Sequence, residues 1–222
     1  MNSLSDIQNV LYINLTSRVD RKKQVEQELG KIGLKGTRFN AISLKNGAIG
    51  CSFSHLKCIP LAKENNWEHV LICEDDIQFL DPKLFINQLN SFLNTNEYWD
   101  VILISGNNIP PYEKTNDYSV RVTRCQTTTG YIVKRHYYDT LIDNYKKGIE
   151  LLMKNPLQHR IYAIDKYWFR LQEKDNWHLI TPLSVVQRAG FSNIEQRVTD
   201  FTKPMLDLDK NSYFQQLLSL KK

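Results

Sequence analysis

The chain has 222 residues, 41% hydrophobic and 24% charged, a composition that predicts one folded domain and excludes intrinsic disorder. Its net charge of +5 is spread over 29 basic and 24 acidic residues without an arginine-rich block, so we expect an anionic small ligand and no nucleic acid partner. The four cysteines form no C-x-x-C pair, the N-terminus lacks a secretory leader, and no apolar run approaches the ~20 residues of a membrane span. These features predict a cytoplasmic protein without a transmembrane segment, folded as a single domain over residues 1–222.

The first third of the chain alternates between candidate strands and helices. Residues 10–15 are apolar and predict a buried strand, a charged amphipathic helix follows, and residues 37–42 predict the next strand. Another helix is expected to open over residues 47–55, with glycines for a tight backbone approach and Ser52 as a candidate cap. This β-α-β order favours a mostly parallel sheet.

An acidic triplet ends the apolar strand over residues 70–73. The carboxylates of Glu74, Asp75 and Asp76 repel one another and resist desolvation, so a cation is expected beside them. In an extended chain, Glu74 and Asp76 point to one face and Asp75 points to the other. Mg²⁺ and Mn²⁺ prefer oxygen ligands and bind through one or two carboxylates plus substrate phosphates. The triplet therefore predicts a divalent cation site, and a solvated acidic turn is the alternative.

The remainder of the chain has weaker periodicity. Asp81-Pro82 marks a helix start, residues 99–104 predict a strand, and the aperiodic stretch 105–119 predicts a long exposed loop of the kind that carries specificity. Gly130 marks either a close approach of a ligand to the backbone or a structural bulge. Extended or helical segments are expected over residues 118–122, 125–133, 136–145, 163–171 and 177–182. The predicted fold class is α/β, with a mostly parallel mixed central sheet flanked by helices.

Four short motifs together resemble glycosyltransferase family 25, which includes bacterial lipooligosaccharide galactosyltransferases and domains that glycosylate collagen hydroxylysine. They follow the family's order: Tyr12-Ile13-Asn14-Leu15 with Arg18, Asp20 and Arg21; Gly50-Cys51-Ser52 with Ser54-His55; Glu74-Asp75-Asp76; and Thr129-Gly130-Tyr131. The resemblance covers roughly residues 8–195, which we take as the core of the domain, and a peripheral C-terminal helix is expected over about 204–222. It implies a GT-A-type, Rossmann-like nucleotide-sugar-binding fold, a UDP-sugar donor, a Mn²⁺ or Mg²⁺ cofactor, and inversion at the anomeric carbon.

The resemblance also implies roles for individual residues. Asp76 and Glu74 correspond to metal ligands of a D-x-D-like motif in which Glu takes the first place. Asp165 corresponds to the acidic residue on the helix after the Gly-Tyr strand and is our first candidate for the catalytic base, with a helix cap as its alternative role. His55 is a second catalytic candidate near the donor, with hydrogen-bonded packing as the alternative. The implied donor-binding residues are Tyr12, Asn14, Leu15, Arg18, Arg21, Asn40, Ala41, Asp75 and Gly130.

The residues and the resemblance predict the same reaction. We expect a metal-dependent, inverting transfer of a hexose (galactose, glucose or N-acetylglucosamine) from a UDP-sugar to a hydroxyl group of a glycan or a hydroxylated protein. The attacking hydroxyl needs a base within ~3 Å of its oxygen. Two alternatives stay open: a catalytically weak nucleotide-sugar-binding module, and a metal-dependent phosphohydrolase. A homo-oligomer is compatible with the sequence.

Overall fold

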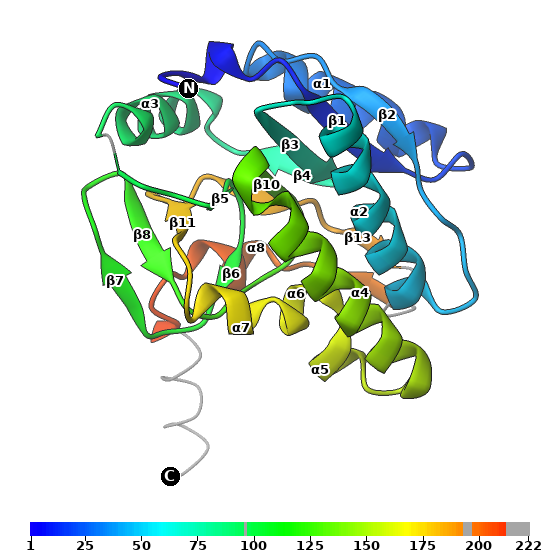
Figure 1. The fold of residues 1–222 in the computed structure, drawn as a ribbon. Coiled ribbons are helices and arrows are strands. Elements are labelled where there is room, and N and C mark those ends of the chain that lie inside the picture. Colours follow the sequence, from blue (N-terminus) through cyan, green and yellow to red (C-terminus); the bar gives the residue numbers. More distant parts are fainter. Residues whose placement is uncertain (96, 193–196, 212–222) are drawn as a thin grey trace, which may run out of the picture.

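A computed structural model describes residues 1–95, 97–192 and 197–211, and it shows a central sheet between two layers of helices (Figure 1). The strand order is β2-β1-β3-β10-β5-β11-β8-β7. The strands of this sheet are β1 (Val10–Asn14), β2 (Thr37–Asn40), β3 (His69–Glu74), β5 (Val101–Leu103), β7 (Tyr112–Lys114), β8 (Ser119–Val122), β10 (Gly130–Lys134) and β11 (Trp177–Ile180). The fold class is therefore α/β, as predicted.

The sheet is mixed, and most of its strands run in one direction. β1 pairs in parallel with β2 and β3, and β5 pairs in parallel with β11. β10 lies antiparallel between β3 and β5, and β8 is antiparallel to both β11 and β7. Since only β8 and β10 are reversed, the carboxyl ends of β1, β2 and β3 meet at one edge, where ligands bind in open α/β sheets.

The helices divide between the two faces of the sheet. The longer helices are α1 (Val19–Lys31), α2 (Gly47–Glu64), α3 (Pro82–Leu93) and α4 (Tyr138–Lys154). The short helical segments are η1 (Leu4–Asp6), η2 (Arg135–Tyr137), α5 (His159–Tyr162), α6 (Ile164–Tyr167), α7 (Phe169–Gln172) and α8 (Thr202–Leu206). In Figure 1, α2 and α4 lie side by side over one face, and the contacts between these two helices place them in one layer.

Successive side chains along each strand point to opposite faces of the sheet, so the protein has two separate hydrophobic cores. Leu11 and Ile13 of β1 pack in a cluster with buried residues of α2 and α4, whereas Val10 and Tyr12 pack in a second cluster with buried residues of α1 and α3. β3 follows the same rule, because successive side chains of a strand point to opposite faces. Burial on both faces explains why β1 and β3 read as continuous apolar runs in the sequence.

The start of α2 shows why the sequence has glycines there. Asn46 caps the helix by accepting a hydrogen bond from the backbone nitrogen of Ile49 at 3.2 Å, so the prediction that Ser52 is the cap is wrong. The Ser52 hydroxyl donates instead to the carbonyl of Ala48, one turn earlier. A Cβ atom at Gly50 would lie 2.5 Å from the carbonyl oxygen of Ile42, so only glycine allows this close approach.

Several sequence expectations are corrected in detail. The helix expected over 163–171 is two short helices, α6 and α7, which separate at Trp168. The stretch expected to be a loop, 105–119, contains β7 and also β6 (Asn107–Asn108), which pairs with β9 (Cys125–Gln126). The expected start of α3 is confirmed, since Asp81 accepts from the backbone nitrogen of Leu84 at 2.9 Å. Most of the helix expected over 204–222 lies outside the described residues.

Two small two-stranded sheets complete the fold near the acidic triplet. β12 (Val185–Gln187) pairs with β4 (Ile77–Phe79), and β13 (Gly190–Ser192) pairs with β14 (Arg197–Thr199). The antiparallel β12–β4 pair brings the late segment 185–192 next to the turn that follows β3. Across the described parts of the chain, no helix is both long and apolar enough to cross a bilayer.

Candidate active site

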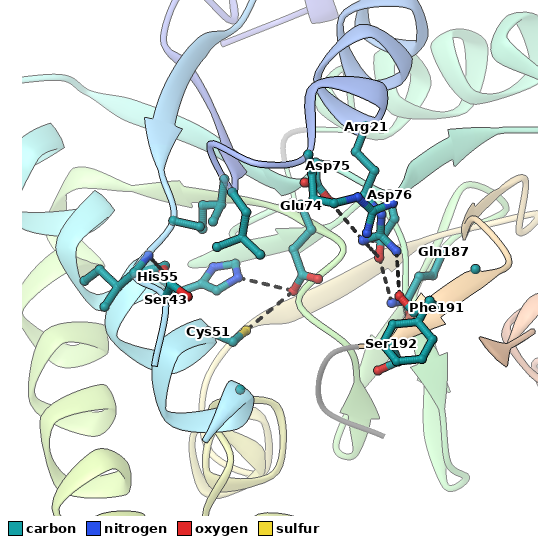
Figure 2. Close-up of a pocket in the computed structure, with 18 of the residues that line it drawn as sticks. Arg21, Ser43, Cys51, His55, Glu74, Asp75, Asp76, Gln187, Phe191 and Ser192 are labelled. Carbon is teal, nitrogen blue, oxygen red and sulfur yellow. Dashed lines mark hydrogen bonds and ion pairs between the residues drawn. The ribbon is translucent and has the colours of Figure 1, made fainter. Parts of the chain in front are cut away.

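The acidic triplet lies where β3 ends and the chain turns toward β4. Glu74 is the last residue of β3, while Asp75 and Asp76 form the turn. The expectation that Glu74 and Asp76 share one face of an extended chain is therefore wrong. The turn sends Glu74 toward α2 and leaves Asp75 and Asp76 beside Arg21 of α1 (Figure 2). Each carboxylate consequently has its own set of partners.

Arg21 holds the two aspartates of the turn. Its Nη1 atom lies 3.0 Å from Oδ1 of Asp75 and 3.2 Å from Oδ2 of Asp76. Asn14 donates to Asp75 at 2.7 Å, and Gln187 of β12 donates to Oδ2 of Asp76 at 3.0 Å. The Arg21 side chain is anchored in turn by the carbonyl oxygen of Phe191 at 3.0 Å. The end of β3 is thus bound to α1 on one side and to β12 and β13 on the other.

The surroundings of Asp76 disfavour its charged form. Burial, together with the charge of Glu74, raises the pKa of Asp76 to about 7 against the opposing charge of Arg21. Burial also raises the pKa of Asp75. Oδ1 of Asp76 is buried and has no hydrogen-bond partner among the described residues. A buried, unpartnered carboxylate oxygen in an anionic cluster is suited to a hard divalent cation.

Glu74 is held by donors from the opposite side. The Thr128 hydroxyl donates to its Oε1 atom, and Nε2 of His55 lies 3.3 Å from the same oxygen. Although burial raises the pKa of Glu74, the hydrogen bonds from His55 and Thr128 outweigh it and bring that pKa below its usual value. Glu74 is therefore an ionised carboxylate with a fixed orientation.

A buried chain of hydrogen bonds continues behind His55. Nδ1 of His55 lies 3.1 Å from the hydroxyl of Tyr131, which accepts from the hydroxyl of Tyr145 at 3.3 Å. This direction makes Tyr131 the donor to Nδ1, so Nε2 carries the proton that faces Glu74. His55 is completely buried and also belongs to the wall of a cavity beside Glu74. Tyr131 and Tyr145 come from β10 and α4, and Tyr131 lies 76 residues after His55 in the sequence.

Two cavities adjoin Glu74. The first has a volume of about 310 Å³ and extends from the acidic triplet to α1 and the segment before α2, with Leu15, Arg18, Arg21, Ala41, Lys45 and His55 in its wall. The second has a volume of about 480 Å³ and lies between the loop 127–129 and the helices α5 to α7, with Asn107, Thr128, His159, Asp165 and Lys166 in its wall. Glu74, Cys51 and Gln187 line both, so the cavities meet at the end of β3.

Asp165 lies in the wall of the second cavity. Its Oδ2 atom pairs with Nζ of Lys166 at 3.0 Å and accepts from the backbone nitrogen of Thr127 at 3.2 Å. Thr127 has φ = 73°, a left-handed conformation that a β-branched residue rarely adopts. The hydrogen bond from Thr127 to Asp165 supports this strained residue, and backbone strain of this kind gathers at functional loops. Asp165 is therefore well placed for a structural role and for contact with a ligand in the second cavity.

The other predicted donor-binding residues differ in whether they line the cavities. Tyr12 is buried and donates its hydroxyl to Glu26, whereas Asn14 donates to Asp75 and so helps to position the turn. Neither residue is in the wall of the two described cavities. Asn40 is exposed at the end of β2 and is not in the described cavity walls, although its neighbour Ala41 lines the first cavity. A Cβ atom at Gly130 would lie 2.7 Å from Cγ1 of Ile104, so the core leaves no room for a side chain at this position.

Several site residues were not predicted as such. Thr128 precedes the Thr129-Gly130-Tyr131 motif, so its position beside the motif was the available signal. Gln187 belongs to a short late strand, and nothing local in its sequence marks it as a partner of Asp76. Cys51 is part of the second motif, but only the structure shows that it lies 4.0 Å from Oε1 of Glu74. Burial and the charge of Glu74 raise the pKa of the Cys51 thiol well above its usual value.

The fold is similar to that of solved structures despite low sequence identity. The crystal structure of A197 from STIV has a TM-score of 0.50 and 13% identity, with 86% of this chain and 93% of that chain covered. A glycosyltransferase involved in glycosylation of the major capsid of PBCV-1 has a TM-score of 0.47 and 15% identity, with 85% and 96% covered. The sheet and its flanking helices form the GT-A-type, Rossmann-like arrangement that the motifs implied.

Two sequence comparisons concern the family of the chain. A Haemophilus influenzae protein named "Putative glycosyltransferase" is 32% identical over 87 residues, an alignment that covers 29% of this chain and 31% of that protein. The chain thus spans less than a third of the length of this relative. Residues 43–168, more than half of the chain, match the family described as "Glycosyltransferase family 25 (LPS biosynthesis protein)". The segment includes α2, the acidic triplet and Asp165, which confirms the resemblance seen in the motifs: the chain belongs to glycosyltransferase family 25.

Proposed function

We propose that this chain transfers a hexose from a UDP-sugar to a hydroxyl group of a glycan or a hydroxylated protein, with a divalent cation and with inversion at the anomeric carbon. Membership of the family supports glycosyl transfer in general. The observation that carries the proposal for this chain is the meeting of two cavities at Glu74, because a group transfer needs two substrates at one point. The first cavity would hold the donor and the second the acceptor.

The charges of the first cavity suit a nucleotide diphosphate. Arg18, Arg21 and Lys45 line it, and Arg18 and Arg21 lie at and just inside the N-terminus of α1, where the helix dipole favours anions. Guanidinium groups bind phosphate oxygens through paired hydrogen bonds. Arg21 is also paired with both aspartates, so a phosphate group beside it would compete with Asp75 and Asp76 for the guanidinium group. A bound divalent cation would supply the positive charge that this arginine cannot give to all three anions.

The residues at the turn fit Mn²⁺ or Mg²⁺. Asp76 would bind the ion through Oδ1, the buried oxygen that has no partner in the described structure, with Glu74 as the second carboxylate of the motif. Such ions bind through few carboxylates and complete their shell with water and phosphate oxygens. When bound, the ion stabilises the negative charge that develops on the departing diphosphate. Gln187 and Arg21 hold Oδ2 of Asp76 and keep Oδ1 in place for this role.

The second cavity offers a base for the acceptor. Its wall contains the carboxylate of Asp165, and the two contacts described above both use Oδ2 of that group. Oδ1 of Asp165 would take the proton of the attacking hydroxyl. Threonine and asparagine side chains in the same wall can hydrogen-bond the other hydroxyls of a sugar. His55 is assigned a positioning role in this proposal, since it orients Glu74 at the junction of the cavities.

The proposal is tested by incubating the protein with Mn²⁺ and a panel of UDP-hexoses, with and without sugar acceptors, and by measuring the release of UDP. We expect release with one donor and faster release with a suitable acceptor. Binding of UDP-sugars without any release would identify a nucleotide-sugar-binding module instead. Hydrolysis of phosphate esters with no preference for sugar nucleotides would identify a phosphohydrolase, and either result would overturn the proposal.

A further inference from the structure

Three side chains with different metal-binding groups converge at the junction of the cavities. Cys51 and His55 lie four residues apart in α2, so both project from one face of the helix, and Glu74 meets them from the end of β3 (Figure 2). The ligand atoms of the three lie within 4.8 Å of one another. Within the described residues, this group is distinct from the Asp75–Asp76 turn, whose partners are Arg21, Asn14 and Gln187.

We propose that Cys51, His55 and Glu74 form a binding site for Zn²⁺, which differs from the proposed Mn²⁺ site at Asp76 and shares only Glu74 with it. A thiolate, an imidazole and a carboxylate suit Zn²⁺, whereas Mg²⁺ and Mn²⁺ prefer oxygen ligands alone. Two ligands four residues apart on one helix and a third from another element is a common arrangement of zinc sites. The inference goes beyond the proposed transfer reaction and does not depend on it.

The distances fit a tetrahedral ion with small adjustments. Bonds of about 2.0–2.3 Å to nitrogen, sulfur and oxygen place the ligand atoms of a tetrahedral zinc site roughly 3.3–3.6 Å apart. Nε2 of His55 lies 3.3 Å from Oε1 of Glu74, and Sγ of Cys51 lies 4.0 Å from the same oxygen. All three ligand atoms lie within 4.8 Å of one another, so Cys51 must move toward the other two to complete the three bonds. The thiol proton passes to solvent as Sγ binds the ion.

The surroundings supply what a metal site needs beyond its ligands. Tyr131 lies 3.1 Å from Nδ1 of His55. When Nε2 binds the ion, the ring proton moves to Nδ1 and the Tyr131 hydroxyl turns to accept the hydrogen bond from Nδ1–H, which fixes the ring. Cys51 and Glu74 line both cavities, so an ion can enter and a fourth ligand can come from either side. Three protein ligands and an open position are typical of accessible zinc sites. Occupation would remove the Glu74 carboxylate from the junction and so oppose sugar transfer.

The experiment is a titration of the whole protein with Co²⁺, which takes the place of Zn²⁺ and reports its ligands by absorption. We expect a thiolate-to-cobalt charge-transfer band that Zn²⁺ abolishes by displacement. Cys51→Ala should remove the band, whereas Cys58→Ala, a matched change at a fully buried thiol of the same helix, should keep it. Tyr131→Phe should keep the band and weaken Co²⁺ binding by ~10–100-fold, the usual effect of losing a hydrogen-bond partner of a ligating histidine.

The results separate this site from the proposed reaction. Asp76→Asn should leave the cobalt band unchanged even if it removes the effect of Mn²⁺ on UDP binding. No thiolate band in the folded parent protein, or a band that persists in Cys51→Ala, overturns the zinc site whatever the protein transfers. A band that disappears in Asp76→Asn would also contradict it, because the two sites would then be one.

Discussion

The two cavities balance charge in different ways. The first is lined by three carboxylates and by arginine and lysine side chains, and one arginine, Arg21, is shared between two aspartates. The second has threonine, asparagine and glutamine side chains in its wall, and its charged groups are Glu74, Arg160 and the Asp165–Lys166 ion pair. The first is suited to a charged ligand that brings a cation, and the second to a neutral ligand rich in hydroxyl groups.

The halves of the sheet behind the cavities differ as well. β2, β1 and β3 are parallel, and their common carboxyl edge gathers charged groups next to the first cavity. β10, β5, β11 and β8 alternate more in direction, and their buried polar groups are mostly neutral. His178 of β11, for example, is almost fully buried beside the ring of Phe92. In this fold, therefore, charged side chains gather at the edge of the sheet where the parallel strands β1, β2 and β3 end together.

The largest effect is expected from Asp165→Asn, which tests whether the second cavity supplies a base. Transfer should fall by ~10²–10⁴-fold, the usual scale for general base catalysis, while UDP binding and stability change little. Turnover with saturating donor and acceptor is the measurement. The matched control is Asp139→Asn, an exposed first-turn aspartate of α4. Near-normal turnover of Asp165→Asn would show that Asp165 is not the base. Its role would then be to accept the hydrogen bond from the backbone nitrogen of Thr127, which asparagine can also accept.

The contrast between the two halves of the sheet also predicts a pH effect on stability. Burial, with a contribution from the charge of Arg121, lowers the pKa of His178 to about 4 from 6.5. Between these values the unfolded chain binds a proton that the folded chain does not, so stability falls as the pH decreases from 6.5 to 4. The contribution lost is about 3 kcal/mol. Urea unfolding across this range should therefore show a smaller pH dependence for His178→Asn, and equal slopes for both proteins would contradict the assignment.

Asp76→Asn tests whether the first cavity binds its nucleotide through a cation. In the parent protein, UDP with Mn²⁺ at ~100 times the dissociation constant should add about 2.7 kcal/mol of stability. The variant should lose most of this gain, because an amide keeps the size of the carboxylate but not its charge. Thermal unfolding with and without Mn²⁺ measures it, with Asp81→Asn, a helix cap, as control. An unchanged Mn²⁺-dependent gain in the variant would place the cation elsewhere.

The smallest effect concerns Asn107, which belongs to the stretch 105–119 that we expected to carry specificity. Its Oδ1 atom is buried without a partner in the described structure, and the residue lines the second cavity. Asn107→Ala should raise the KM of the acceptor by about 3–10-fold, the value of one hydrogen bond, and leave the KM of the donor unchanged. Asn94→Ala, at the exposed end of α3, is the control. Equal changes for both substrates would show that Asn107 serves the core.

Local sequence patterns determined the elements that form the first half of the sheet. The apolar runs of β1 and β3, the amphipathic stripe of α1 and the Asp81-Pro82 start of α3 all appear where they were predicted, because burial and capping depend on residues close in the sequence. The acidic triplet at the end of β3 was equally visible. Family motifs identified Arg21, His55 and Asp165, all of which lie at the two cavities.

Only the tertiary structure decided how these residues meet. The turn at residues 75–76 separates Glu74 from Asp76, and their partners Thr128 and Gln187 are more than fifty residues away in the sequence. Tyr12 and Gly130, which the motifs placed at the donor, instead pack against Glu26 and Ile104. A local pattern records which residues are apolar, charged or flexible. The contacts that define a site depend on strand order and register, which arise from pairing between distant segments.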